Sequence, residues 1–333
     1  MNSHPFIQTC LLLVVAFSSI GFCFANKQPL EIKNMMPVSQ LYGLPRPMGA
    51  DIIFGGGSQV RIGFEVTNNF SGARKNNDVV FYDGETYWTT FSARHVFGDQ
   101  ASYEVGLTIP YISHGPGYLD SFIERFHDFF GFPNGSRNEV PHNQLDYRIR
   151  LDGEDFLNLQ SKKSNIGDLR AWFGYQLFRT TSSALAMRAM IKFPTGHVAD
   201  MTGSGAADLS IWAEYQNSNL LNAWHLNLTF GGGITFLGQG DLLPSRQKSI
   251  SGIFHFGVQR SLANRVRLIA QLDGHTRLLE TPFDQIGGFS LQGTLGGRIA
   301  IREDYWLDFG LVENLIGDSA PDFTLQLALT GQF

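Results

Sequence analysis

Apolar and polar side chains alternate along most of this chain, in segments about as long as a strand needs to cross a membrane. In the clearest segment every second residue is apolar: Val60, Ile62, Phe64 and Val66. Successive side chains of a strand point to opposite faces, so each segment has one apolar and one polar face. After residue 25 no apolar run approaches the roughly 20 residues of a membrane-spanning helix. Any membrane crossing after residue 25 therefore has to use strands.

Twelve such segments follow one another, an even number as expected of a closed bacterial barrel. They cover residues 59–67, 85–97, 102–111, 168–177, 185–193, 207–215, 224–236, 250–258, 266–278, 289–301, 305–311 and 323–333. Alternation is poor over 85–97, where placing Tyr87, Phe91 and Phe97 outside puts Arg94 inside. Short connections alternate with long ones, at residues 71–83, 113–165, 195–205, 238–248, 280–287 and 313–322, which matches periplasmic turns and extracellular loops. We predict an all-β fold, a transmembrane antiparallel β-barrel of about 12 strands.

The first 25 residues have the pattern of a secretory signal peptide. Residues 6–24 are almost wholly apolar, and Cys23 and Ala25 place small side chains before a cleavage site at Asn26. A membrane anchor or a lipoprotein signal are the alternatives, but basic flanks are missing and Phe22 precedes Cys23. We therefore predict cleavage near Ala25 and location in the outer membrane of a Gram-negative bacterium. The expected parts are a signal peptide (1–25), an N-terminal periplasmic or lumenal segment (26–56) and the barrel (57–333).

The composition is typical of strands and turns and narrows the partners. Charged residues make up 17%, against about 25% in soluble domains. The net charge of −5 argues against a nucleic-acid partner, which leaves outer-membrane lipid and lipopolysaccharide as the expected surroundings. A soluble β-sandwich or lipocalin-like barrel would also alternate, but twelve strands are many for one soluble barrel.

The last predicted strand ends on an aromatic residue in phase with its apolar face. That face contains Phe323, Leu325, Leu327, Leu329 and Phe333. It resembles the C-terminal signal that the barrel-assembly machinery recognises, so we predict that these residues serve as an assembly signal and that this machinery is a partner.

With the apolar faces toward lipid, the polar faces line the lumen. The lining residues predicted in this way are Arg61, Glu65, Arg94, Glu104, Asp168, Arg170, Arg188, Lys192, Asp208, Glu214, His225, His255, Arg267, Asp273, His275, Arg277, Arg298, Arg302 and Asp308. Unpaired charge in a narrow lumen is costly, so most of these charges should pair across strands. Some of them could instead line a selective path, and the three histidines could lie close together.

Two segments are long enough to obstruct a barrel of this size, which lies between side-chain-filled and open barrels. Residues 26–49, rich in Pro and Met, could enter the lumen from below. The longest loop, residues 113–165, contains a capping box at Ser121–Glu124 and a helix stop at Gly131. Apolar residues fall on one face of this predicted helix, and form either a lid packed on the rim or a gate: Phe122, Ile123, Phe126, Phe129 and Phe130.

Enzyme motifs are few, and the sequence offers no catalytic residue, cofactor site or metal site to assign. Neither G-x-S-x-G nor H-E-x-x-H occurs. Ser113 and His114 are adjacent on a strand and point to opposite faces, so they are a poor nucleophile–base pair. Residues 152–155 are acidic but lack the oxygen spacing of a calcium loop, and a turn is the better interpretation.

The sequence around the predicted helix resembles a known family. Residues 117–131 (GYLDSFIERFHDFFG), 41–45 (LYGLP) and 193–196 (FPTG) are similar to an uncharacterised bacterial outer-membrane family, domain of unknown function thirty-one eighty-seven. The resemblance covers about residues 35–333 and implies a barrel without an assigned activity. A looser likeness, carried by GDLR at 167–170 and GSGAAD at 203–208, is to outer-membrane channels for hydrophobic compounds.

Three functions fit these observations. The first is a channel or transporter for small apolar or amphipathic molecules. The second is a structural or interaction barrel with a closed lumen. The third is a barrel-embedded lipid enzyme, which would depend on a loop histidine such as His114, His142 or His197. We expect no enzymatic activity, and the sequence does not separate the first two functions.

Overall fold

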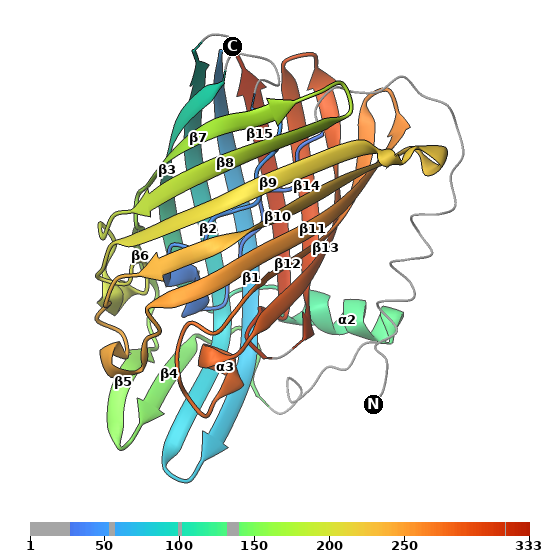
Figure 1. Cartoon of the computed structure of the whole chain (residues 1–333). Helices are drawn as coiled ribbons and strands as arrows, with labels where there is room; N and C mark the ends of the chain where they lie inside the picture. Colours follow the sequence, from blue (N-terminus) through green and yellow to red (C-terminus); the bar gives the residue numbers. More distant parts are fainter. Residues whose placement is uncertain (1–26, 53–56, 99–101, 132–139, 317) are drawn as a thin grey trace.

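Twelve strands pair in sequence order into one closed antiparallel barrel, which confirms the predicted fold class (Figure 1). The structure is a computed structural model that describes residues 27–52, 57–98, 102–131, 140–316 and 318–333, so the predicted signal peptide lies outside the described residues. The barrel strands are β1 (Ser58–Lys75), β2 (Asp78–Phe97), β3 (Tyr103–Gly115), β7 (Arg170–Arg179), β8 (Ser183–Lys192), β9 (Asp208–Leu221), β10 (Leu226–Leu237), β11 (Ile250–Ala263), β12 (Val266–His275), β13 (Ser290–Arg302), β14 (Tyr305–Ile316) and β15 (Phe323–Gln332). Pairing of β1 with β15 closes the barrel.

The outward faces of the strands carry an apolar belt, and the inward faces carry buried polar residues. Phe91 of β2 is 51% exposed, whereas Arg94 of the same strand is 8% exposed, so the orientation predicted for the poorly alternating segment is confirmed. The belt continues around the barrel through residues such as Phe64, Leu107, Phe173, Ile191, Ile234, Phe254, Ile299 and Leu327. An exposed apolar surface of this extent requires lipid rather than water around it.

The two ends of the barrel differ in the length of their connections. At one end the turns are short, for example residues 180–182 between β7 and β8 and residues 303–304 between β13 and β14. At the other end long connections carry the short helices η4 (Val198–Asp200), η6 (Pro244–Arg246) and α3 (Asp284–Gly287). We call these the short-turn end and the long-loop end.

The connection predicted over residues 71–83 is wrong, because β1 and β2 continue as a paired hairpin as far as Lys75 and Asp78. The added strands β4 (Asp146–Leu151) and β5 (Glu154–Leu159) extend this hairpin into a sheet beyond the rim, and β6 (Lys163–Ile166) adds to β3. Tyr82 is fully buried, with its ring centroid 5.7 Å from that of Tyr147. Residues 71–83 have the sequence pattern of a loop, but contact with the β4–β5 hairpin stabilises them as strands.

Residues 27–52, which we call the plug segment, lie inside the barrel (Figure 1). The segment starts at the short-turn end, where Lys27 Nζ donates a hydrogen bond to Ser218 Oγ at 2.7 Å. It rises to the short helix η1 (Ser39–Leu41) and returns to the short-turn end, where Asp51 pairs with Arg179 at 3.2 Å. Its apolar residues Leu30 and Ile32 pack against inward-facing Ile269 and Val312.

The largest apolar core lies at the long-loop end, where it fills the mouth of the barrel. The top of the plug segment, the β4–β5 hairpin and three loops all contribute to it. We call it the mouth core, and its principal buried residues are Met36, Val38, Leu41, Tyr42, Leu44, Val80, Tyr82, Tyr147, Ile149, Leu159, Met201, Leu242, Leu243, Leu278, Leu279, Phe283 and Ile286. Burial of apolar surface stabilises by about 25 cal/mol per Å², so the packing of this core is the main contribution to closing the mouth.

The predicted helix in the longest loop is present as α2 (Asp120–Phe130), and it lies against the outer face of the wall (Figure 1). Phe126 and Phe122 place their ring centroids 5.6 Å and 5.9 Å from that of Phe323 on β15. Asp120 accepts a hydrogen bond from Asn68 Nδ2 of β1 at 3.0 Å. Phe323 and Asn68 are in phase with the outward-facing apolar residues of their strands, so α2 lies beside the wall and spans the β1–β15 junction. Within the described residues, no helix is long and apolar enough to cross a membrane.

Candidate functional site: the plugged lumen

The predicted lining residues lie on the inward face of the wall with three exceptions. His225 follows η5 (Asn222–Trp224) with a φ of 54° and is exposed in a turn, because the strand starts only at Leu226. Arg277 and Arg302 are exposed at the rims, so these three assignments are wrong. The buried remainder is Arg61, Glu65, Arg94, Glu104, Asp168, Arg170, Arg188, Lys192, Asp208, Glu214, His255, Arg267, Asp273, His275, Arg298 and Asp308.

Several of these charges pair with one another across strands, on neighbouring strands or, for Glu104 of β3 and Arg188 of β8, over Gly174 of the strand between them. Glu104 receives Arg188 Nε at 2.5 Å and lies 3.4 Å from Arg94. Arg298 pairs with Asp308 on the next strand at 2.5 Å. The expected cross-strand pairing of lumenal charge is thus present, and it satisfies groups that would be costly if buried alone.

Other wall side chains bind the backbone of the plug segment. Gln271 accepts a hydrogen bond from Leu30 N at 3.1 Å and donates one to Leu30 O at 3.0 Å. Gln176 does the same for two plug residues, accepting from Ile52 N at 2.8 Å and donating to Ala50 O at 2.9 Å. These contacts satisfy backbone groups that a non-strand segment would otherwise leave unpaired inside the barrel. The plug segment is therefore docked through side chains and not as an additional strand.

Charged groups hold the top and the middle of the plug segment. Lys192 lies 2.8 Å from Asp168 and 3.1 Å from Asp208, and also donates to Leu41 O at 3.1 Å. Asp208 in turn accepts from Gly43 N at 2.7 Å. A Cβ at position 43 would lie 2.7 Å from Asp208 Cβ, so this approach requires glycine.

Arg46 of the plug segment forms a bidentate ion pair with Glu65 of β1. Its Nη2 donates to Glu65 Oε2 at 2.7 Å, and its Nη1 contacts Glu65 Oε1. Gln326 Nε2 also donates to Glu65, at 3.2 Å. Bidentate arginine–carboxylate pairs are among the stronger polar contacts in proteins.

Lys33 lies near the top of the plug segment and is fully enclosed. Its ammonium donates to Gln40 O at 2.5 Å and lies 4.8 Å from the ring centroid of Trp88. A carbonyl and an aromatic face thus take the place of a carboxylate partner at this position.

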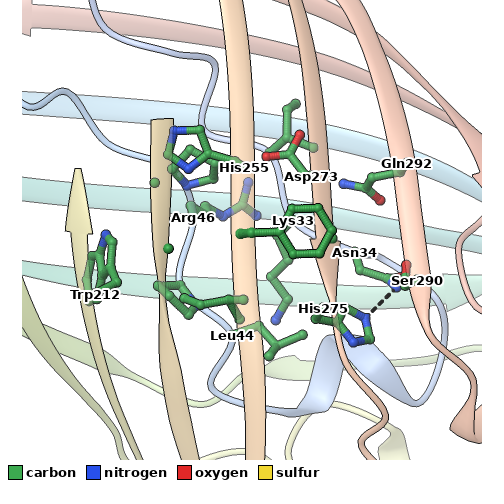
Figure 2. A pocket seen from close by; sticks show the side chains of 18 of the residues that line it. Lys33, Asn34, Leu44, Arg46, Trp212, His255, Asp273, His275, Ser290 and Gln292 are labelled. Carbon is green, nitrogen blue, oxygen red and sulfur yellow. Dashed lines mark hydrogen bonds between the residues drawn. The ribbon is translucent and has the colours of Figure 1, made fainter. Parts of the chain in front are cut away.

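A cavity of about 50 Å³ remains between the plug segment and strands β9–β13 (Figure 2). Leu44, Trp212 and Ile253 form its apolar part. The plug segment contributes Lys33, Asn34 and Arg46 to its polar part. The polar residues that the wall contributes are Glu214, His255, Asp273, His275, Ser290 and Gln292. A second cavity of about 40 Å³ lies on the other side of the plug segment and borders Arg170 and Trp172.

The five residues predicted to form a gate lie on α2, away from these cavities. Ile123 is buried against the wall, Phe122 and Phe126 contact Phe323, and Phe129 is 82% exposed. The side chain of Phe130 lies outside the described residues. Because α2 lies beside the wall and not across the mouth, the predicted gate has no part in the proposal below.

The predicted assembly residues share the outward face of β15. Leu327 and Leu329 are exposed, and Phe333 lies at the short-turn end with its ring centroid 6.1 Å from that of Tyr305. Phe323 is buried under α2. Their role as an assembly signal stays a prediction.

The histidines named for the enzyme hypothesis lie in separate environments. His114 is buried, with Nδ1 2.9 Å from Thr86 Oγ1 and Nε2 2.9 Å from Met201 O, so both ring nitrogens have partners. His142 contacts Glu124 at 2.8 Å, and His197 is exposed before η4. In the part of the chain that the structure describes, no three His, Cys, Asp or Glu residues are grouped as a metal site. Residues 152–153 form the predicted turn, both with positive φ.

Comparison of the sequence with known families gives one match, which covers nearly the whole chain. Residues 6–333 match the family described as "Protein of unknown function (DUF3187)". The chain belongs to this family. The resemblance seen in the GYLDSFIERFHDFFG segment is thereby confirmed. No curated protein matches the chain.

The solved structures similar to this family member include a bacterial outer membrane channel. The COG4313 outer membrane channel from Pseudomonas putida F1 has 13% identity and a TM-score of 0.57, with 84% of this chain and 96% of that chain covered. At this identity the likeness shows a shared fold. The toluene transporter TbuX from Ralstonia pickettii has 12% identity and a TM-score of 0.39, with 94% and 98% covered. The beta domain of the Bordetella autotransporter BrkA has 10% identity and a TM-score of 0.45, with 84% and 100% covered.

The sequence did not identify most of the groups that surround the cavity. Trp212, Gln292 and Asn34 carry no charge pattern that would single them out. The polar phase of each strand was the available signal, and it does place Gln292 on an inward face. Which inward residues meet the plug segment depends on its path, and that path is not encoded in any local pattern.

Proposed function

We propose that this protein is an outer-membrane channel for small amphipathic molecules, closed in the described conformation by the plug segment. The observation that carries the proposal is the way in which residues 27–52 occupy the lumen. They form no strand pairing with the wall and are bound mainly through side chains. Side-chain hydrogen bonds of this kind contribute about 1 kcal/mol each, since water replaces them when they break. Such a segment is suited to leave or shift while the barrel stays closed on itself.

The chemistry along the lumen supports an amphipathic solute. At the long-loop end a solute meets the apolar mouth core, and deeper it meets the charged wall. The cavity beside the plug segment combines both kinds of surface, with Leu44 and Trp212 near Glu214 and Asp273. A purely apolar molecule would have to cross the charged region, and a strongly polar one would have to cross the mouth core.

The test compares the mature protein with a variant that lacks residues 27–52, both refolded and inserted into liposomes and planar bilayers. Loss of heat-modifiable mobility in gels identifies misfolded samples, which are discarded. We expect the wild type to conduct rarely and to give little liposome swelling, and the deletion variant to conduct continuously and to swell at least several-fold faster with small solutes.

A structural barrel is the second candidate, and the filled lumen supports it. The mouth core closes one end without any contribution from α2. If the folded deletion variant neither conducts nor swells with any solute, loops alone close the barrel. The channel proposal then fails, and a structural or interaction role takes its place.

A further inference from the structure

One row of buried polar residues crosses consecutive strands of the wall, and two of its side chains, those of Asp273 and Gln292, have few partners. Strand pairing aligns Glu214, Gly231, His255, Asp273 and Gln292 on the consecutive strands β9 to β13. All four side chains of this row face the cavity beside the plug segment and are less than one-tenth exposed. The row therefore forms a polar wall on one side of a closed space.

Gly231, in the row between Glu214 and His255, has no side chain, and this decides where the His255 ring lies. Because Gly231 has no side chain, His255 leans across it, and His255 Nε2 lies 3.0 Å from Glu214 Oε2. A Cβ at position 231 would lie 2.1 Å from His255 Cε1. His255 thus turns away from its other neighbour in the row, Asp273.

Asp273 is left as a buried carboxylate without a cation. Its oxygens accept hydrogen bonds from Gln271 Nε2 at 3.0 Å, and within the described residues it forms no ion pair. Two cations line the same cavity, and both are held by other partners: Arg46 is bound to Glu65, and Lys33 donates to Gln40 O. A buried carboxylate with one neutral donor is costly, so a positive charge beside it would be strongly favoured.

Gln292 is the next residue of the row, paired in register with Asp273, and Figure 2 shows the two side chains next to each other. Gln292 is 1% exposed, and neither its amide nitrogen nor its amide oxygen has a hydrogen-bond partner. Buried amides are rarely left with both groups unpaired. Its Oε1 offers an acceptor beside the Asp273 carboxylate, which is the arrangement that an ammonium donor requires.

We propose that this cavity binds a small primary ammonium ion, with Asp273 as its anionic partner and Gln292 as a second acceptor, so that the solutes of the channel are small amphipathic amines. Leu44, Trp212 and Ile253 would contact the alkyl part. A cavity of about 50 Å³ has room for about four non-hydrogen atoms, since one water needs roughly 10–15 Å³ on this scale. The substrate class rests on the proposed channel function, whereas binding itself does not.

The test measures binding of n-propylammonium to the folded mature protein in detergent, by calorimetry and by saturation-transfer NMR. The neutral isostere 1-propanol and the anion propionate are the charge controls. We expect propylammonium to bind at least tenfold more tightly than 1-propanol, and propionate not to bind. Asp273→Asn should lower the affinity at least tenfold, and Gln292→Leu several-fold. Asp304→Asn makes the same charge change in an exposed turn and should leave binding unaltered.

Each other outcome contradicts a stated part of the reasoning. Equal binding of propylammonium and 1-propanol, or unchanged binding in Asp273→Asn, overturns the ammonium site. If propylammonium does not bind but the variant lacking residues 27–52 conducts, the amine is wrong as the substrate class and the channel proposal still stands. Binding that depends on Asp273, in a protein whose deletion variant never conducts, supports the site but removes the channel.

Discussion

Replacing Arg46 by methionine should release the plug segment without opening the barrel wall. Methionine keeps an unbranched apolar stem but lacks the guanidinium group, so both hydrogen bonds to Glu65 are lost. Hydrogen bonds to charged groups contribute about 1.5–3 kcal/mol, and Glu65 retains only Gln326 as a partner. The Arg46 side chain is 12% exposed, so solvent screening is limited, but water that enters the lumen offsets part of the loss. We expect docking of the plug segment to weaken by about 2–3 kcal/mol, which corresponds to a roughly 30- to 150-fold larger undocked population.

Amide hydrogen exchange reads this population directly. The amides of Leu30, Gly43 and Ile52 donate to wall side chains, so they exchange only when the segment undocks. In Arg46→Met their exchange should accelerate by the same factor, while amides within the barrel strands stay unchanged. Bilayer recordings on the same variant should show a matching rise in the frequency of opening.

The matched control is Arg94→Met, which also removes a buried arginine from the lumen. Arg94 pairs with Glu104 of the wall, and Glu104 keeps Arg188 in this variant. Exchange of the plug amides should therefore stay close to that of the wild type. Equal acceleration in both variants, or none in Arg46→Met, would refute the assignment of Arg46 as the anchor. The double variant Arg46→Met/Glu65→Gln should be less perturbed than Arg46→Met, because no unpaired carboxylate remains.

Two further substitutions test the packing. Gly231→Ala should destabilise the barrel by about 1–3 kcal/mol in urea unfolding, because its Cβ would lie 2.1 Å from His255. Gly232→Ala should be nearly neutral, because its Cβ would meet nothing closer than 3.6 Å. Equal effects of the two substitutions would contradict the account of the leaning histidine. Phe323→Ala should loosen α2 by about 3 kcal/mol and expose it to proteolysis while the barrel keeps its heat-modifiable mobility; a protected helix would show that the ring contacts do not hold it.

The parts of the fold that the sequence predicts are those that follow from local patterns, chiefly the alternation of apolar and polar residues. Outward Phe91 and inward Arg94 follow from the period of two alone, and α2 follows from its cap and stop signals. The side of the wall on which α2 lies depends on Phe323, which is nearly 200 residues away in the chain. His225 was misassigned because a turn with positive φ ends the alternation just before Leu226.

The candidate site was less predictable for the same physical reason. Charge and strand phase place Glu214, His255 and Asp273 on the lumenal face. They do not show that His255 leans over Gly231, because that depends on the register between two strands. Nor do they show that Gln292 lacks partners, since this becomes visible only when the path of the plug segment is known.

The route of the plug segment through the lumen also has a topological consequence. Both of its ends emerge at the same rim, near Ser218 and near Arg179, so the segment forms a loop that is not threaded through the barrel. A loop of this kind can be withdrawn by tension from one side, without breaking a strand pair and without passing a chain end through the wall. The topology therefore lets the segment leave the lumen from the short-turn side as a loop.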